Sequence, residues 1–204
     1  YADSLIEGLN DTDFMEKIKT AQINWIGKSV GAEVDFKLKD VEDELKVFTT
    51  RCDTLYGVTF MVMSPEHPFL EKYQDRIKNI DELKAYQDAA KAKSEIERTD
   101  ESKEKTGIKL DGLEAVNPVS GEVIPIYVSD YVLAGYGTGA IMAVPAHDTR
   151  DYAFAKKFGI KIIPVIEGGD ISKEAYTGDG VHINSGVLNG LGKEDAINTC
   201  LKYL

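Results

Sequence analysis

Cysteine, histidine and tryptophan are scarce in this 204-residue chain, which contains two, three and one of them. Cys52 and Cys200 make no disulfide framework, and with three scattered histidines they form no zinc-type cluster. We therefore expect no metal site and a reduced, cytoplasmic protein. Long hydrophobic runs are also missing: none approaches the roughly 18 residues of a membrane span, and no signal-peptide pattern is present. No membrane partner is expected.

Positive charge is in deficit, since 24 lysines and arginines face 35 acidic residues, for a formal net charge of -11. Tight phosphate binding needs clustered basic side chains, so this balance argues against a basic nucleic-acid-binding surface that acts on its own. The charge balance does not exclude a pocket that receives only the end of a nucleic acid, delivered by another part of a protein.

The length allows roughly one to two domains with a real core. The chain starts without Met, inside a helical pattern, and stops while a helical pattern is still running. We interpret residues 1–204 as a single domain excised from a larger protein.

Periodicity of the apolar residues predicts an α+β fold: a mixed, barrel-like sheet surrounded by helices. Within it, the charged segment 71–106 is expected to be a helix followed by a loop. Asp13 and Glu16 resemble a capping box. Helices are predicted over 13–26, 81–97, 148–158 and 195–204, and strands over 32–38, 44–50, 58–63, 123–128, 140–144 and 160–166.

A cluster of hydroxyls and charges stands where the second predicted strand stops. Thr50 and Asp53 fit a capping box that opens one helical turn, which ends at Gly57. On one interpretation these residues only satisfy backbone amides. On the other, the hydroxyls of Thr49, Thr50 and Thr54 polarise a carbonyl, position a water molecule and test the shape of a side chain.

A second cluster begins a helix. Asp148 is the expected N-cap, and Gly159 is the expected end of the helix. Asp151 is either the partner of the cap or a carboxylate that binds an ammonium group. Arg150 either binds a phosphate or pairs with one of the two acids.

Other candidates are weaker. His67 is expected at a helix start or in a loop, and His182 is expected to face solvent from a strand. Cys52 with His147 is a possible thiol nucleophile pair. The glycine-rich residues 137–139 lack the ending of a phosphate-binding P-loop and are expected to form a tight turn or a close backbone approach.

Three separated motifs, taken in order, resemble the editing domain of leucyl-tRNA synthetase, a class I aminoacyl-tRNA synthetase. They are Thr49–Gly57, Glu66–Pro68 and Gly137–Tyr152. The similarity extends to Asn24–Gly27 before them and to residues 184–186 and 189–191 after them. Asp53-Thr54-Leu55 and Met142–Pro145 are similar to the leucine branch rather than to the valine or isoleucine enzymes.

The resemblance implies post-transfer editing: hydrolysis of the ester that joins norvaline, isoleucine or methionine to the 3′-terminal adenosine of tRNA(Leu). Asp151 would hold the substrate ammonium group, and the Thr54 methyl would clash with the γ-branch of leucine. Thr49 and Thr50 would bind the adenosine and stabilise the oxyanion and the attacking water. The residues that would line or brace this pocket are Arg51, Asp53, Tyr136, Met142, Val144, His147, Asp148 and Arg150.

The resemblance also implies the partners. The rest of the synthetase would lie in cis and hold most of the tRNA, and ATP and Mg²⁺ would be used in another domain. Editing itself would need no cofactor. The isolated domain is expected to be a monomer that binds tRNA weakly.

Two segments depart from the family pattern. Cys52 stands where the family usually has proline, which is expected to loosen the turn and make the site sensitive to thiol reagents. Residues 105–115 also differ and are expected to form a rim loop. The alternatives are a relaxed tRNA-positioning or structural insertion, a thiol hydrolase using Cys52 and His147, and the editing domain of a valyl or isoleucyl enzyme.

Overall fold

The computed structural model describes residues 2–27, 31–100, 103–135 and 137–204, and it divides into two compact units, Tyr1–Gly31 and Ala32–Leu204. That both belong to one domain stays a prediction. Within the described part of the chain, no helix is both long and apolar enough to cross a membrane.

The first unit contains α1 (Ala2–Gly8), the 3-10 helix η1 (Leu9–Asp11) and α2 (Glu16–Ile26). The helix predicted over 13–26 is therefore present. The predicted capping box is wrong, because the N-cap is Met15 and no side chain caps it. The helix ends at Gly27, whose left-handed φ of 60° favours glycine.

The second unit is built around a four-stranded sheet with the order β4-β5-β3-β6. Its strands are β4 (Ile108–Val116), β5 (Val123–Val128), β3 (Phe60–Met63) and β6 (Ala140–Ala143). β3 is parallel to β5, whereas the β4–β5 and β3–β6 pairs are antiparallel. This confirms the predicted mixed sheet.

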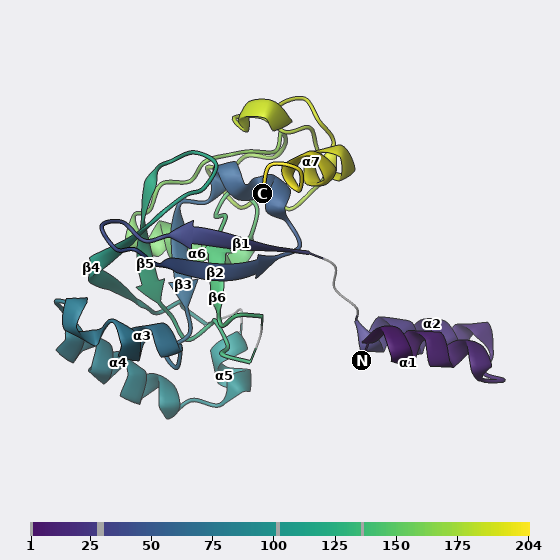
Figure 1. Ribbon diagram of the computed structural model, residues 1–204, viewed down its shortest axis with the longest axis horizontal. Helices are drawn as coiled ribbons and strands as arrows, with labels where there is room; N and C mark the ends of the chain where they lie inside the picture. Colours follow the sequence, from purple (N-terminus) through teal and green to yellow (C-terminus); the bar gives the residue numbers. More distant parts are fainter. Residues whose placement is uncertain (1, 28–30, 101–102, 136) are drawn as a thin grey trace. The chain divides into compact units, whose positions relative to one another are not determined.

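A separate hairpin of β1 (Ala32–Lys37) and β2 (Glu44–Thr49) runs across the strands of the larger sheet (Figure 1). The predicted α+β fold is present, but the described strands do not close into a barrel. The six residues of β1 pair with the six of β2 in an antiparallel register that runs from Ala32 opposite Thr49 to Lys37 opposite Glu44. In the described chain, one isolated bridge, Leu38 with Ala115, joins the hairpin to the larger sheet.

The alternating side chains of β3 divide the core into two clusters, as the period of two in a strand requires. Met61 and Met63 pack in the cluster that contains the side chains of the hairpin. Phe60 and Val62 pack in the other cluster, with Phe154 of the helix α6 (Thr149–Phe158). The sheet therefore has the hairpin on one face and α6 on the other.

The segment 71–106 contains more short helices than predicted. They follow α3 (Pro68–Lys72) as η3 (Gln74–Arg76), α4 (Ile80–Lys91) and α5 (Glu95–Thr99). The helix predicted over 81–97 is interrupted because Ser94 and Glu97 form a capping box, which starts a new helix. The chain continues after α6 through η4 (Gly186–Leu188) to α7 (Lys193–Cys200).

Two predictions about strands are wrong. Residues 105–115 are not a rim loop, since most of them belong to β4. Residues 160–166 form no strand; Ile166 makes a single bridge to His182. The amides of Val165 and Ile166 instead bond to the ring of His147, so they are not available for a ladder.

Candidate functional site

The chain turns sharply where β2 ends and enters the 3-10 helix η2 (Cys52–Gly57). One helical turn was predicted here, but its capping box is wrong: Arg51 is the N-cap, without a side-chain cap. Instead, Thr49 Oγ1 accepts a hydrogen bond from Arg51 N at 3.0 Å, and the Thr54 hydroxyl donates to Arg51 O at 2.9 Å. These contacts hold the threonine cluster in place at the strand end.

Asp148 begins α6 as predicted. Its Oδ1 accepts hydrogen bonds from Arg150 N at 2.8 Å and Asp151 N at 3.2 Å. Its carboxylate also pairs with the Arg150 guanidinium, at 3.0 Å from Nη2. Burial raises the pKa of Asp148, but the hydrogen bonds and charge of Arg150 outweigh burial and leave this pKa lowered. Arg150 therefore pairs with Asp148.

Asp151 is not the partner of the cap, because its carboxylate bonds to Val144 and Tyr131 rather than to the backbone of Asp148. Its side chain accepts from Val144 N at 2.9 Å and from the Tyr131 hydroxyl at 3.0 Å, and the residue is 4% exposed. Burial, followed by the negative charge of Asp148, raises the pKa of Asp151 to about 7. Such a carboxyl group strongly favours a cation beside it.

The end of β2, η2, β6 and α6 together enclose a pocket of about 220 Å³. Ten predicted site residues line it: Thr49, Thr50, Arg51, Thr54, Met142, Val144, His147, Asp148, Arg150 and Asp151. Phe48 and Ile141 line it too and were not predicted; each is an ordinary apolar residue of a strand, with no sequence signal that separates it from the core. Tyr136 lies outside the described residues.

Asp53 does not line the pocket but lies buried behind Arg51. It accepts two hydrogen bonds from the Arg51 guanidinium, at 2.9 and 2.8 Å, and its Oδ2 lies 2.9 Å from His182 Nε2. The prediction that His182 faces solvent is wrong, since this residue is 1% exposed. Because His182 alternates with Val181 and Ile183, the sequence suggested that it lies on the outer face of a strand. Only the fold shows that its ring is buried against the carboxylate of Asp53.

His147 lines the pocket, but both of its ring nitrogens are engaged. Nε2 accepts from the amides of Val165 and Ile166 at 3.0 and 3.1 Å, so Nδ1 carries the proton and donates to Tyr176 O at 2.8 Å. Burial lowers the pKa of His147. The ring is thus a neutral brace rather than a free base.

The thiol nucleophile pair finds no support in this geometry. Cys52 is 2% exposed, and its Sγ lies 4.0 Å from Ile197 O. His67, in contrast, lies where it was expected. It caps α3, with Nδ1 accepting from Phe69 N at 3.1 Å.

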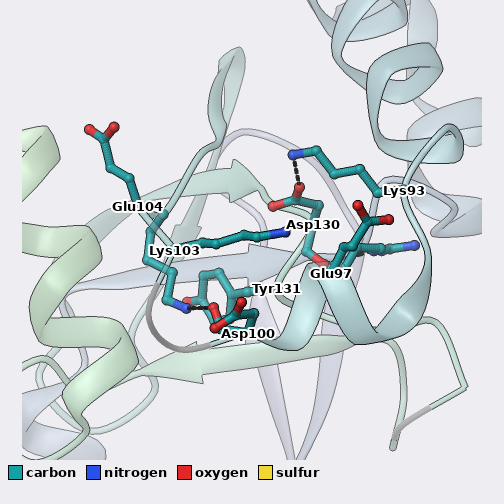
Figure 2. Close-up of a pocket in the computed structure, with 9 residues that line it drawn as sticks. Lys93, Glu97, Asp100, Lys103, Glu104, Asp130 and Tyr131 are labelled. Carbon is teal, nitrogen blue, oxygen red and sulfur yellow. Dashed lines mark hydrogen bonds and ion pairs between the residues drawn. The ribbon is translucent and has the colours of Figure 1, made fainter.

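A second pocket, of about 80 Å³, is lined almost entirely by charged side chains (Figure 2). Lys93 and Asp130 form an ion pair of 2.6 Å across it. Arg98 binds the carbonyls of Asp130 and Val132 and the carboxylate of Glu66. Lys93, Arg98 and Asp130 thus have partners within the protein, and the volume is small for a nucleotide. No three His, Cys, Asp or Glu residues are grouped to hold a metal anywhere in the described ranges.

A family model described as leucyl-tRNA synthetase, editing domain, matches residues 23–204. The chain belongs to this family. Membership places the chain among editing domains, which serve translation fidelity. The match extends over the whole pocket and both clusters of the core.

A solved structure agrees with this assignment. The chain is similar to one in the crystal structure of the ternary complex of Agrobacterium radiobacter K84 agnB2 LeuRS with tRNA and LeuAMS, at 35% identity and a TM-score of 0.68. The similarity covers 85% of this chain and 21% of that one, so this chain spans about a fifth of the synthetase. The fold of the editing-domain family is confirmed.

Proposed function

We propose that this domain hydrolyses the ester of mischarged tRNA(Leu), releasing norvaline, isoleucine or methionine and sparing leucine. The observation that carries the proposal is Asp151, a buried carboxyl group in the wall of the pocket. Its ordinary partners are two neutral hydrogen-bond donors, and the nearby Arg150 is paired with Asp148. The substrate ammonium group would supply the missing cation.

The raised pKa of Asp151 links its charge state to the binding of a charged amine. A cation within about 4–6 Å favours the ionised carboxylate, so binding of the ammonium group drives off the proton that burial retains. Asp151 and the residues Thr49, Thr50 and Thr54 line the same pocket. The aminoacyl carbonyl, which is two bonds from this nitrogen, would then reach the threonines.

Thr54 supports the exclusion of leucine. Its hydroxyl is bonded to Arg51 O, so the side-chain group left to meet a ligand is the methyl. Synthetase double-sieve editing is the established example of this logic: one methyl group distinguishes amino acids by only about 1–3 kcal/mol, so a second site must reject the correct product by shape. A methyl against the γ-branch of leucine would do so.

Hydrolysis itself would rest on positioning. Thr49 Oγ1 accepts from a backbone amide, which leaves its hydroxyl proton for a ligand, and the exposed Thr50 adds a second hydroxyl. A water molecule held there adds to the ester carbonyl. The bond to the ribose oxygen then breaks, this oxygen takes up the proton that the water releases, and amino acid and tRNA leave. Because His147 is engaged, we propose that the ribose hydroxyl of the substrate assists the water.

The whole substrate implies partners in cis. We propose that the rest of the synthetase holds the body of tRNA(Leu) and uses ATP and Mg²⁺ in another domain, and that this domain receives the 3′-terminal adenosine. The isolated chain, a monomer on this proposal, would hydrolyse the same esters more slowly.

The test is deacylation of isoleucyl- and norvalyl-tRNA(Leu) by the synthetase that carries this domain, with Asp151→Ala. We expect rapid clearance by the parent and a loss of at least about 100-fold in the variant, since the ammonium contact orients the ester. Asp88→Ala, at a side chain that is 78% exposed, is the matched control and should keep the full rate. No clearance by the parent would overturn the proposal in favour of a structural or tRNA-positioning insertion.

A further inference from the structure

A third hollow, of about 300 Å³, lies at the far end of the hairpin from the pocket that Thr49 and Asp151 line. It is lined by Lys39, Asp40, Arg76, Lys78, Lys109, Leu110, Gly112 and Glu114, which we call the basic hollow. Four cationic and two acidic side chains face it, in a chain whose net charge is -11. The basic hollow is therefore a local reversal of the overall charge.

Three segments form this hollow, and backbone contacts join them. Lys39 N donates to Glu114 O at 2.9 Å, which ties the hairpin turn to β4. Lys78 N donates to Asp111 O at 2.8 Å, which ties the segment after η3 to the same strand. The cations thus project from a connected frame, which lowers the conformational cost of binding.

Gly112 allows these segments to approach. Its φ is +102°, and a Cβ built there would lie 2.5 Å from Arg76 O, so any side chain would push the two backbones apart. The position falls within a register shift of β4 between Lys109 and Glu114. Such irregularities redirect side chains locally. Here the shift falls within the stretch of β4 that lines the hollow.

Most of the positive charge in the hollow is available to a ligand. Lys39 pairs with Glu114 at 2.9 Å. Arg76, Lys78 and Lys109 are exposed and make no ion pair within the described ranges. Three unpaired cations around a concave surface match closely spaced anions better than a single carboxylate would.

We propose that the basic hollow binds backbone phosphates of the tRNA at a point away from its 3′ end. This inference rests on the proposed function, which supplies the polyanionic partner. Lys39 precedes β2, whereas Thr49 ends β2 in the pocket, so the strand separates the two sites by roughly 17 Å at about 3.4 Å per residue. The hollow therefore engages other nucleotides than the terminal adenosine and would orient the acceptor end over the pocket.

The test compares the 204-residue chain with the triple variant Arg76→Gln/Lys78→Gln/Lys109→Gln. Lys84→Gln/Lys173→Gln/Lys202→Gln removes the same charge from exposed positions that line none of the hollows described above. Fluorescence anisotropy of labelled tRNA(Leu) gives the affinity from 50 to 200 mM salt. Deacylation is followed with isoleucyl-tRNA(Leu) and with isoleucyl-adenosine, which reaches only the pocket.

We expect the triple variant to lose at least about tenfold in tRNA affinity at 50 mM salt. The slope of log K against log salt should fall by about 2, because each phosphate contact contributes 0.7–0.9. Deacylation of the tRNA should slow in parallel, while hydrolysis of isoleucyl-adenosine keeps its rate. Equal affinity and slope in the triple and control variants would overturn the inference. So would a triple variant that loses binding to phosphatidylserine vesicles but keeps its binding to tRNA(Leu), because the basic hollow would then bind a membrane surface instead.

Failure of the proposed function gives a different result. If the unmodified chain binds tRNA but hydrolyses neither ester, the hydrolytic assignment fails, and the affinity and its salt slope still decide whether the basic hollow binds phosphates.

Discussion

The hydroxyl of Tyr131 donates a hydrogen bond to Oδ1 of Asp151 over 3.0 Å, and both residues are buried. Tyr131 belongs to the aromatic cluster between the sheet and α6, with its ring 5.9 Å from that of Phe154. The bond therefore links the packing behind the sheet to the charge state of the pocket wall. Apart from the Val144 amide, it is the side-chain contact that most favours the ionised form of Asp151.

Tyr131→Phe should shift the pH dependence of deacylation. Burial raises the pKa of Asp151 to about 7, and the Tyr131 hydroxyl opposes that rise, so its removal moves this pKa higher by about one unit. Initial rates between pH 6 and 8.5 should show that the rise of activity with pH moves to higher pH, with several-fold less activity at pH 7. Tyr127→Phe, in the same aromatic cluster, is the control. Superimposable profiles would show that the hydroxyl does not position the carboxylate.

Asp151→Asn should abolish deacylation and yet stabilise the fold at high pH. The pKa is about 7 in the folded chain and 3.8 unfolded, so the folded state keeps a proton that the unfolded state releases between these values. The free energy of unfolding contributed by Asp151 consequently falls as pH rises through this window, by roughly 2–3 kcal/mol from pH 5 to pH 8. The asparagine does not titrate, so its urea midpoint should gain on the parent at pH 8 but not at pH 5. If the urea midpoints of the parent and the variant change equally between pH 5 and pH 8, burial does not raise the pKa of Asp151.

Thr54→Ala should admit leucine. The methyl that remains after the hydroxyl bonds to Arg51 O is the group assigned to exclude the γ-branch, and alanine removes it. Hydrolysis of leucyl-tRNA(Leu) should rise by about 10-fold or more, on the scale of 1–3 kcal/mol for one methyl. Thr54→Val keeps the branched shape and should keep leucine out, provided the lost hydrogen bond is tolerated. If Thr54→Ala still hydrolyses leucyl-tRNA(Leu) slowly, Thr54 is not the residue that excludes leucine.

The cysteines should resist modification, contrary to the sensitivity expected from sequence. Cys52 and Cys200 are 2% and 3% exposed, and the Cys200 thiol donates to Cys52 O at 3.1 Å. Iodoacetamide labelling, read by mass spectrometry, should be at least about tenfold slower in the folded chain than in urea, because burial blocks access of the reagent to both thiols. Deacylation should persist during that time. Rapid labelling of the native chain with loss of activity would restore the sequence-based expectation.

The motifs contain most of the residues that line the pocket, because these residues cluster along the chain. Thr49 to Thr54 follow one strand, and Met142 to Asp151 run from a strand into the helix that it precedes, so local geometry alone brings each group to one edge. The partners of these residues lie far away in the chain. His182 contacts Asp53, which lies 129 positions away in the sequence, and Tyr131 contacts Asp151, 20 positions away. The periodicity of a sequence cannot predict such contacts.

The fold shows the same division. Alternation correctly predicted β1 and β2, and the apolar run 58–63 predicted β3, because these patterns reflect local burial. Residues 160–166 have the same apolar pattern but form no strand, because the amides of Val165 and Ile166 donate to the ring of His147. β4 was missed although it is nine residues long, because a register shift interrupts its alternation.

The sequence by itself determined the local elements, the resemblance to an editing domain and the two groups of residues that line the pocket. Only the tertiary structure decided that the sheet stays open, that Asp151 is buried rather than a helix cap, that His147 is neutral and engaged, and that four cations meet around Gly112. The physical reason is that pKa, tautomer and local charge depend on which distant groups approach in space. Spacing along a chain reports only its neighbours.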